Sequence, residues 1–323
     1  MNRGPRLKLL SAALFASLLP LTAHAQQEGL NETQTLLRAD SRSSATPTLA
    51  TTTVEVNNRP APLQALTAVR PSGVQIALLI DEGLRRTSGL QLPDIKQFIR
   101  TLQPGTEIFV GYMQNGRVVA DVPFTTNLTA AAEGVRMVMG VPGQSASPYF
   151  CLSDFVKNWP GTPAVEGPRT TGNKARFVIM LTNGVDPYNG STSVMNQDSP
   201  YVKAAADDAE RAGVVVSSIY FPDAGVGGNS ASFSGQSYLQ QVADATGGQS
   251  YYQGTITPVA ILPFFKQFQH DISETYVATF QANAGSHPHG ELLRLKVKTS
   301  IPALKLRHAE AVRPGNMEGQ PNS

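Results

Sequence analysis

The sequence predicts an α/β fold, in which a doubly wound, mostly parallel sheet has helices on both faces and a pair of strands at its end. Two fully apolar runs, 74–80 (VQIALLI) and 175–182 (ARFVIMLT), are typical of strands buried on both faces. Helical patterns alternate with these and later strands, and such alternation favours a parallel sheet wrapped by helices. An early hairpin indicates one antiparallel strand within this sheet.

The chain has the composition of a globular protein. It contains 323 residues, of which 41% are hydrophobic and 15% charged, so it can bury a core and form one or two domains. Its formal net charge is +2, but the first 25 residues hold three basic and no acidic side chains. The remainder, with 23 basic and 24 acidic residues, lacks the positive charge typical of nucleic-acid binding. Cys151 is the single cysteine, which excludes an intramolecular disulfide.

The first 25 residues have the pattern of a cleaved export signal. A basic start is followed by an apolar stretch that is short for a membrane span, and AHA at 23–25 matches a cleavage pattern. We therefore expect a periplasmic or secreted protein with no membrane span after cleavage. Residues 26–50, which are polar and rich in Thr and Ser, are expected to form a flexible linker.

The first half of the folded region predicts strands, a helix and a hairpin. Residues 51–56 (TTTVEV) fit a strand, and a proline-containing segment leads from there to the buried strand at 74–80. In 92–102 (LPDIKQFIRTL) the apolar residues fall on one helical face, and Pro93 suits the first turn. The apolar segments on either side of QNG at 114–116 predict the hairpin.

The second half predicts helices with recognisable N-caps and further strands. The expected helices open after Asn127, Ser147, Ser199 and Thr257, with another over 238–248, and the expected strands are 175–182, 214–221 and 249–252. Pro263 is expected to kink the last helix. The segments 275–282 (TYVATFQA) and 291–299 (ELLRLKVKT) predict the terminal strand pair.

Polar residues stand just past three of the predicted strands. Asp81 follows the first buried strand, Asn183 the second, and Asp223 the strand at 214–221. Ligands of such sheets bind outside the carboxyl ends of the strands. We therefore expect these side chains to share one rim.

The order of these features resembles the von Willebrand factor A domain: a strand with Asp, a helix, a hairpin, a helix, and a strand with TNG. The later segments QQVADATGGQSYY, SETYVATFQA and LRLKVKT are similar to the exported bacterial, acidobacterial-type "VWFA-related" family. The resemblance covers residues 51–310 and leaves 311–323 as a tail. It implies a Rossmann-like fold with a metal-ion-dependent adhesion site.

The resemblance implies that the adhesion site of this chain is degenerate. The family motif is Asp-x-Ser-x-Ser after the first strand, a Thr on a second loop, and an Asp in a later Thr-Asp-Gly turn. These oxygen ligands suit Mg²⁺, which retains some water and accepts a partner's carboxylate. The chain keeps Asp81 but has Gly83 and Arg85 at the two Ser positions and Asn183 at the later Asp.

The second-loop Thr position stays open among several residues. Ser145 or Ser147 fits the order of the family better than Thr125 or Thr126. One carboxylate and at most one hydroxyl hold Mg²⁺ poorly. The expected site therefore binds no metal and no other cofactor.

The positive charge of Arg85 suggests what replaces the ion. We expect Arg85 to pair with Asp81 and to supply the charge that a metal would supply. Two alternatives stay open. In one, Arg85 and Arg86 are solvated surface charges; in the other, Asp186 or Asp223 replaces the lost ligands and Mg²⁺ is retained.

Other kinds of chemistry find little support in the sequence. GPRTTGNK at 167–174 departs from a phosphate-binding loop and precedes a strand. No nucleophile elbow occurs. HPHGE at 287–291 fits an exposed hairpin tip better than a metal site.

These observations favour an exported, non-enzymatic module that binds an unidentified protein through the strand-end rim. The alternatives are a structural or assembly component of an envelope complex and, with less support, an unrecognised hydrolase. A His converging with Ser or Asp at the rim would favour the hydrolase. The predicted rim residues are Asp81, Gly83, Arg85, Ser145, Ser147, Asn183 and Asp186.

Overall fold

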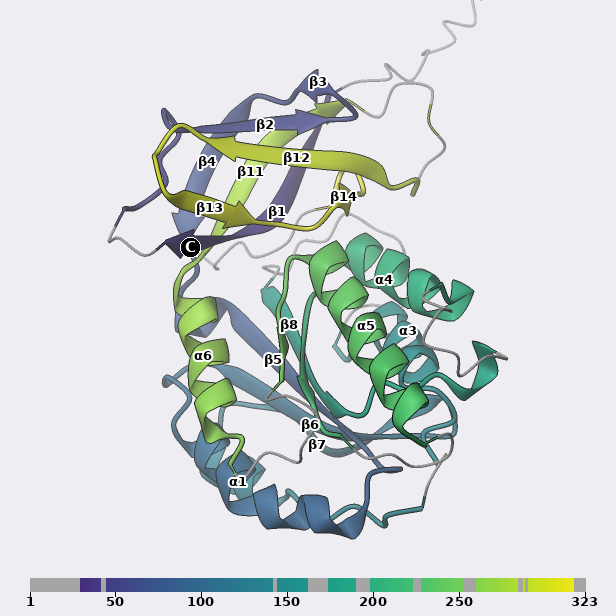
Figure 1. Cartoon of the computed structure of the whole chain (residues 1–323). Helices are drawn as coiled ribbons and strands as arrows, with labels where there is room; N and C mark the ends of the chain where they lie inside the picture. Colours follow the sequence, from purple (N-terminus) through teal and green to yellow (C-terminus); the bar gives the residue numbers. More distant parts are fainter. Residues whose placement is uncertain are drawn as a thin grey trace, which may run out of the picture.

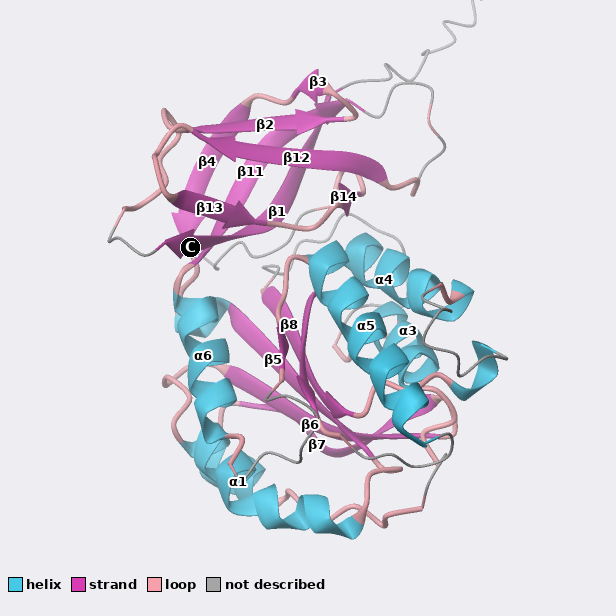
Figure 2. Cartoon of the chain, viewed as in Figure 1, coloured by secondary structure: helices cyan, strands magenta, loops and turns pink. Residues whose placement is uncertain are grey.

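The computed structural model of the chain shows an α/β unit beneath two smaller sheets (Figure 1). Figure 2 shows that the helices gather around the six-stranded sheet of the α/β unit. The structure describes residues 30–316 except 42–44, 142–143, 162–173, 190–197, 223–227, 253–259, 284–286 and 288–289, and gives only the backbone of 41 and 228–233. The predicted signal at 1–25 and Asp223 lie outside the described residues.

The α/β unit has the predicted doubly wound sheet. Read from β7, its strands follow the 3-2-1-4-5-6 order that is typical of this fold class. Every pairing is parallel except that of β6 with β7, which form the predicted hairpin. The strands are β5 (Val74–Asp81), β6 (Glu107–Gln114), β7 (Arg117–Thr125), β8 (Ala175–Thr182), β9 (Val215–Tyr220) and β10 (Ser250–Tyr251).

Helices cover both faces of this sheet, because side chains of the central strand β5 alternate between two cores. Ile76 and Leu78 pack with Phe98 under the first group of helices, whereas Ala77 and Leu79 pack under the second. The first group is α1 (Leu92–Arg100), α2 (Leu128–Glu133) and α6 (Leu262–Ser273). The second group is α3 (Pro148–Lys157), α4 (Pro200–Ala212) and α5 (Gly228–Thr246). Short 3-10 turns, η1 (Pro71–Gly73), η2 (Arg86–Gln91) and η3 (Pro187–Asn189), complete the unit.

The local signals for helix and turn formation act as predicted, with one exception. Asn115 and Gly116 adopt positive φ angles of 52° and 75° in the hairpin turn. The Asn127 side chain accepts the Ala130 N–H at 3.0 Å at the start of α2. The kink expected at Pro263 is wrong, because α6 begins at Leu262 and a proline in the first turn removes no helical hydrogen bond. The expected start at Thr257 lies outside the described residues.

The flexible linker expected at 26–50 is wrong for residues 30–41. They form the strand β1 (Leu30–Ser41), which lies between β13 (Leu304–Arg307) and β11 (Thr275–Asn283). Gln34 is 2% exposed and its side-chain N–H donates to Thr279 Oγ1 at 3.1 Å. The strand escapes a periodicity search because buried threonines and glutamine take positions where apolar residues are expected.

The terminal strand pair is also wrong, because the two C-terminal strands belong to different sheets. β11 lies between β1 and β4 (Leu63–Ala68), and β12 (Leu293–Thr299) lies between β14 (Ala311–Val312) and β2 (Thr52–Val56). β2 also pairs with β3 (Arg59–Pro60). The two sheets face each other (Figure 1) around a core that includes Val54, Val56, Phe280, Leu293 and Leu295. The prediction of a tail at 311–323 is also wrong for its first residues, because Val312 and Asn316 are buried, at 3% and 2% exposed.

Polar contacts join this β-sandwich to the α/β unit. Arg38 of β1 pairs with Asp271 of α6 at 2.6 Å. Glu210 of α4 accepts the Ala311 N–H of β14 at 2.7 Å. The two units therefore meet along α4 and α6.

None of the helices in the described part of the chain is long and apolar enough to cross a membrane.

Candidate functional site

The candidate site lies at the switch point of the sheet, where β5 and β8 run side by side and the chain leaves in opposite directions. Asp81 ends β5 and Thr182 ends β8. Thr182 Oγ1 donates to Asp81 Oδ2 at 2.6 Å, and the Gly83 N–H donates to Asp81 Oδ1 at 2.8 Å. Asp81 is 2% exposed and Thr182 is fully buried. Both oxygens of the predicted site carboxylate are thus engaged by the chain.

The loop after β8 is held in place by its own hydrogen bonds. The Gly184 N–H donates to Thr182 Oγ1 at 3.1 Å, and the Val185 N–H donates to Asn183 Oδ1 at 3.0 Å. Gly184 has a φ of 67°, and a Cβ on Gly235 would lie 2.2 Å from the Asn183 carbonyl oxygen. These contacts fix the loop that carries Asn183, which directly follows Thr182, the hydrogen-bond partner of Asp81.

Asp186 supports the loop that it belongs to. Its carboxylate accepts the Tyr188 N–H at 3.2 Å and the Ser199 hydroxyl at 2.9 Å. Ser199 in turn caps α4. Asp186 is 6% exposed, and its hydrogen bond with Ser199 joins the loop to α4.

The two predicted serines lie at the start of α3. Ser147 is fully buried and its hydroxyl accepts the Tyr149 N–H at 3.3 Å as the N-cap. The Ser145 carbonyl accepts the Gly116 N–H at 3.1 Å and the Cys151 thiol at 3.2 Å. The structure gives Ser147 a capping role and joins the Ser145 backbone to the β6–β7 turn.

Burial and negative charge shift the pKa values of the ionisable groups beneath the rim. Burial, with a smaller effect of Asp81, raises the pKa of Cys151 to about 12. Burial, followed by the charges of Asp186, Tyr238 and Asp81, raises the pKa of Tyr149 well above its usual range. Both groups stay protonated at neutral pH. Cys151 is consequently a poor nucleophile.

Arg85 is exposed, whereas its predicted partner Asp81 is buried. Arg85 precedes the 3-10 turn η2, in an extended conformation. The predicted ion pair between the two side chains stays a prediction. Gly83, between them in sequence, contributes its N–H to Asp81 and has no side-chain oxygen.

A second buried carboxylate, Glu82, was not singled out in the sequence. It is 1% exposed and accepts two hydrogen bonds from the Arg136 guanidinium, at 3.1 and 3.0 Å, and one from the Met139 N–H at 2.7 Å. Arg136 also pairs with Asp121 at 2.7 Å and lies 3.7 Å from the centre of the Tyr112 ring. The only sequence signal at this network is the lone arginine in the otherwise uncharged segment 134–141, and it does not identify Glu82 as the partner.

The residues present do not fit the divalent ion that the von Willebrand factor A resemblance implies. Asp81 and Asn183 already accept hydrogen bonds from the chain, and Gly83 lacks a side-chain oxygen. Asp186, which could have replaced a lost ligand, is committed to Ser199 and the Tyr188 N–H. Within the described residues, no three His, Cys, Asp or Glu side chains are grouped so that they could hold a metal.

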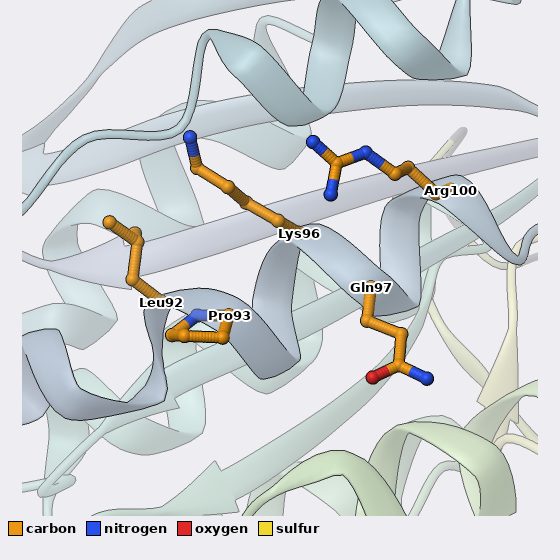
Figure 3. Close-up of a pocket in the computed structure, with 5 residues that line it drawn as sticks. All are labelled: Leu92, Pro93, Lys96, Gln97 and Arg100. Atoms are coloured by element: carbon orange, nitrogen blue, oxygen red, sulfur yellow. The ribbon is translucent and has the colours of Figure 1, made fainter.

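A separate hollow of about 560 Å³ lies on the outer side of α1. Figure 3 shows that Lys96 and Arg100 extend to one side of this helix and Gln97 to the other. Both basic side chains pair with Glu133, Lys96 at 3.6 Å. The single carboxylate of Glu133 therefore offsets part of their positive charge.

Comparison with known proteins found no matching family model and no matching curated protein. The similar solved structures include BatB from Bacteroides thetaiotaomicron, with 14% identity, a TM-score of 0.40, and coverage of 62% of this chain and 98% of that one. A von Willebrand factor type A protein from Catenulispora acidiphila has 10% identity, a TM-score of 0.41, and coverage of 92% and 78%. The SpRpn10 VWA domain has 8% identity, a TM-score of 0.37, and coverage of 60% and 94%.

The strand order and the helices on both faces establish the α/β, Rossmann-like class of this unit. Several of the similar structures are von Willebrand factor A domains. The narrower resemblance to the exported acidobacterial-type group stays a prediction.

Proposed function

We propose that this chain is an exported, non-enzymatic module that binds a protein partner through the strand-end rim without a metal ion. The observation that supports the proposal is the hydrogen bonding at the switch point, where both oxygens of Asp81 are engaged by Gly83 and Thr182. A buried carboxylate that is satisfied in this way needs no ion to be stable. It forms the floor of the rim, and Arg85 is an exposed residue of the rim.

The chemistry of the rim favours binding over hydrolysis. The described histidines, His270, His287 and His308, lie in α6, ahead of β12 and just after β13, so none of them joins the rim serines. Cys151 is fully buried and its pKa is raised to about 12 by burial. The described rim thus offers no activated nucleophile.

Export to the periplasm or beyond is proposed from the pattern of residues 1–25 alone. A protein partner in the same compartment follows from it. The partner is therefore sought in an extract of the cell envelope.

Photo-crosslinking from the rim tests the binding proposal. A crosslinking amino acid replaces Arg85 in one variant and Val119, which is exposed on β7, in a matched control. The rim variant should capture one defined protein from an envelope extract of the source cell, identified by mass spectrometry, and the control should not. Capture from β7 alone, or equal capture from both positions, would contradict binding through the rim.

The metal-free part of the proposal has its own measurement. An ion that binds only the folded state raises the melting temperature by mass action. We expect the same melting temperature in millimolar Mg²⁺, in Mn²⁺ and in EDTA, and the same crosslinking yield. A reproducible stabilisation by either ion would show that Asp81 and its neighbours retain a metal site.

A further inference from the structure

We propose that a surface beside the strand-end rim binds an acidic polypeptide segment that also carries large apolar side chains. This inference rests on the proposed protein-binding function and adds the chemistry of the partner. The surface, called here the arginine–methionine surface, consists of Arg85, Arg86, Leu90, Met137, Met139 and Val141, which are all exposed.

Two segments that are distant in sequence pack together to form this surface. Arg86 Nε donates to the Met139 carbonyl at 3.1 Å. A Cβ on Gly89 would lie 3.2 Å from Met137 Cε, and one on Gly140 would lie 2.8 Å from Arg86 Cγ. The turn η2 and the segment after α2 are therefore in direct contact, and their exposed side chains form one patch.

The buried carboxylate of Glu82 fixes the methionine segment. It accepts the Arg136 guanidinium twice and the Met139 N–H at 2.7 Å. Val138 is 6% exposed and packs in the core. Met137 and Met139, on either side of the buried Val138, are 51% and 56% exposed. The backbone that carries the two methionines is therefore anchored to the fold by Glu82 and Val138.

Exposed apolar area is concentrated on this surface. Ten large hydrophobic side chains are exposed among the described residues, and four of them are here, including Leu90 at 78%. Contiguous exposed apolar side chains with polar neighbours mark interaction sites. Methionine suits such a site because its flexible thioether adapts to different partner side chains.

The surface carries positive charge, and the acidic side chains next to it are either buried or already paired with basic side chains. The segments 83–91 and 134–141 contain three arginines and no acidic residue. Of the carboxylates directly before them, Asp81 and Glu82 are 2% and 1% exposed. The exposed Glu133 is paired with Lys96 and Arg100. Within the described chain, Arg86 donates to a carbonyl and retains its charge. A complementary partner therefore places carboxylates next to apolar side chains.

The charge is too small to favour a membrane as the partner. Juxtamembrane recognition of anionic lipid uses clusters of about four to eight basic residues. Here Arg136 is paired with Glu82 and Asp121, the surface contains only two further arginines, and the whole chain has a formal net charge of only +2. A polypeptide segment fits this surface better than an anionic lipid surface.

Selection from a random peptide library displayed on phage tests the inference. The full chain is the target, and the variant Met137→Ser/Met139→Ser is the counter-selection. Enriched peptides should combine Asp or Glu with large apolar residues. A synthetic copy of the most enriched peptide should bind at least about tenfold more weakly to the double variant and to Arg86→Glu, and Arg86→Lys should retain most of the affinity.

Matched variants separate this surface from general effects of charge and polarity. Val119→Ser and Arg59→Glu change exposed residues on β7 and β3 and should bind the peptide like the unaltered chain. Melting curves of all variants establish that they fold. Enriched peptides without acidic residues, or equal affinity for surface and control variants, would overturn the inference.

Two further experiments would show that something other than an acidic polypeptide binds this surface. Binding to phosphatidylglycerol vesicles that the double methionine variant abolishes would assign the surface to lipid. A concentration-dependent dimer that the same variant disrupts would assign it to a second copy of the chain. Rim crosslinking that captures its protein equally well from the methionine and Arg86 variants would overturn this inference and leave the proposed protein-binding function intact.

Discussion

The hydrogen bond between Thr182 and Asp81 is the residue-scale feature that holds the candidate site together. It joins the ends of the two central strands at 2.6 Å, and both side chains are buried. A buried carboxylate that loses a donor keeps its desolvation cost without compensation. The pair is therefore important both for stability and for the shape of the rim.

Replacing Thr182 with valine tests this role because the two side chains have nearly the same shape. Thr182→Val should lower the free energy of unfolding by about 1–3 kcal/mol, since Asp81 Oδ2 loses its hydroxyl donor. Thr67→Val, at an exposed position of β4, should change it by less than about 0.5 kcal/mol. Urea denaturation measures both. Equal stability of the two variants would show that the hydrogen bond is not needed.

At this scale the sequence indicated part of the site. Asp81 and Asn183 could be recognised because each stands next to the end of an apolar strand. The roles of Glu82 and Arg136 could not, because their pairing depends on how the segment after α2 packs against the strand end. Residues 54 positions apart in sequence give no local sign of such contact.

Helix α4 carries the element-scale feature with the clearest consequence for pH dependence. Its Glu210 is 6% exposed and accepts the Ala311 N–H of β14 at 2.7 Å. Burial raises the pKa of Glu210 from its ordinary 4.5 to about 7, the Ala311 N–H lowers it, Asp207 and Glu310 raise it, and Lys203 lowers it slightly. Protonation of one side chain is thus linked to the contact between the two units.

This shift predicts a loss of stability as the pH rises. Because the folded state holds the Glu210 proton more tightly than the unfolded state, its contribution is full below pH 4.5 and is lost as the pH passes about 7. Glu210→Gln keeps an oxygen for the Ala311 N–H but cannot ionise. The free energy of unfolding of the variant should therefore exceed that of the unaltered chain at about pH 8 and fall less with pH.

Chemical denaturation from about pH 5 to about pH 8 measures this difference. Asp207→Asn, on the same helix, should retain most of the pH dependence of the unaltered chain. Burial lowers the pKa of His308, so its titration contributes with the opposite sign, and that contribution is common to all three chains. Parallel pH profiles of Glu210→Gln and the unaltered chain would contradict the assignment to Glu210.

Individual elements were predictable where one local rule determined them. The β6–β7 hairpin forms because Asn115 and Gly116 accept positive φ angles, and α4 starts where Ser199 supplies a cap. β1 was not predictable, because Thr33 and Gln34 are buried and their hydrogen-bond partners Gly315 and Thr279 lie far away in the sequence. Their polarity locally resembles that of a linker.

The chain as a whole folds with a β-sandwich built from both of its ends around a continuous α/β unit. β1 occupies an inner position between β13 and β11, and its Leu36 and Leu37 are buried. An inner strand satisfies the backbone groups of both neighbours. Its removal therefore leaves two strands with unpaired edges.

Truncation tests the place of β1 in the whole molecule. A chain that begins at Ala45 lacks β1, and its sandwich should become sensitive to protease. The part of the thermal unfolding transition that comes from the sandwich should also disappear. A chain that begins at Leu30 keeps β1 and should melt like the full chain. The readouts are limited proteolysis with mass spectrometry and circular dichroism. Equal protease resistance of the two truncated chains would show that residues 30–44 act as a linker after all.

The α/β unit could be predicted from local sequence patterns. Strands buried on both faces require continuous apolar runs, and helices that cover them require apolar faces at helical spacing, so both are visible locally. Long-range packing sets the pairing of β1, β11 and β12, the place of Val312 in the sandwich core, and the burial of Glu82. These features depend on which distant partner satisfies each polar or apolar side chain, and no local pattern encodes that choice.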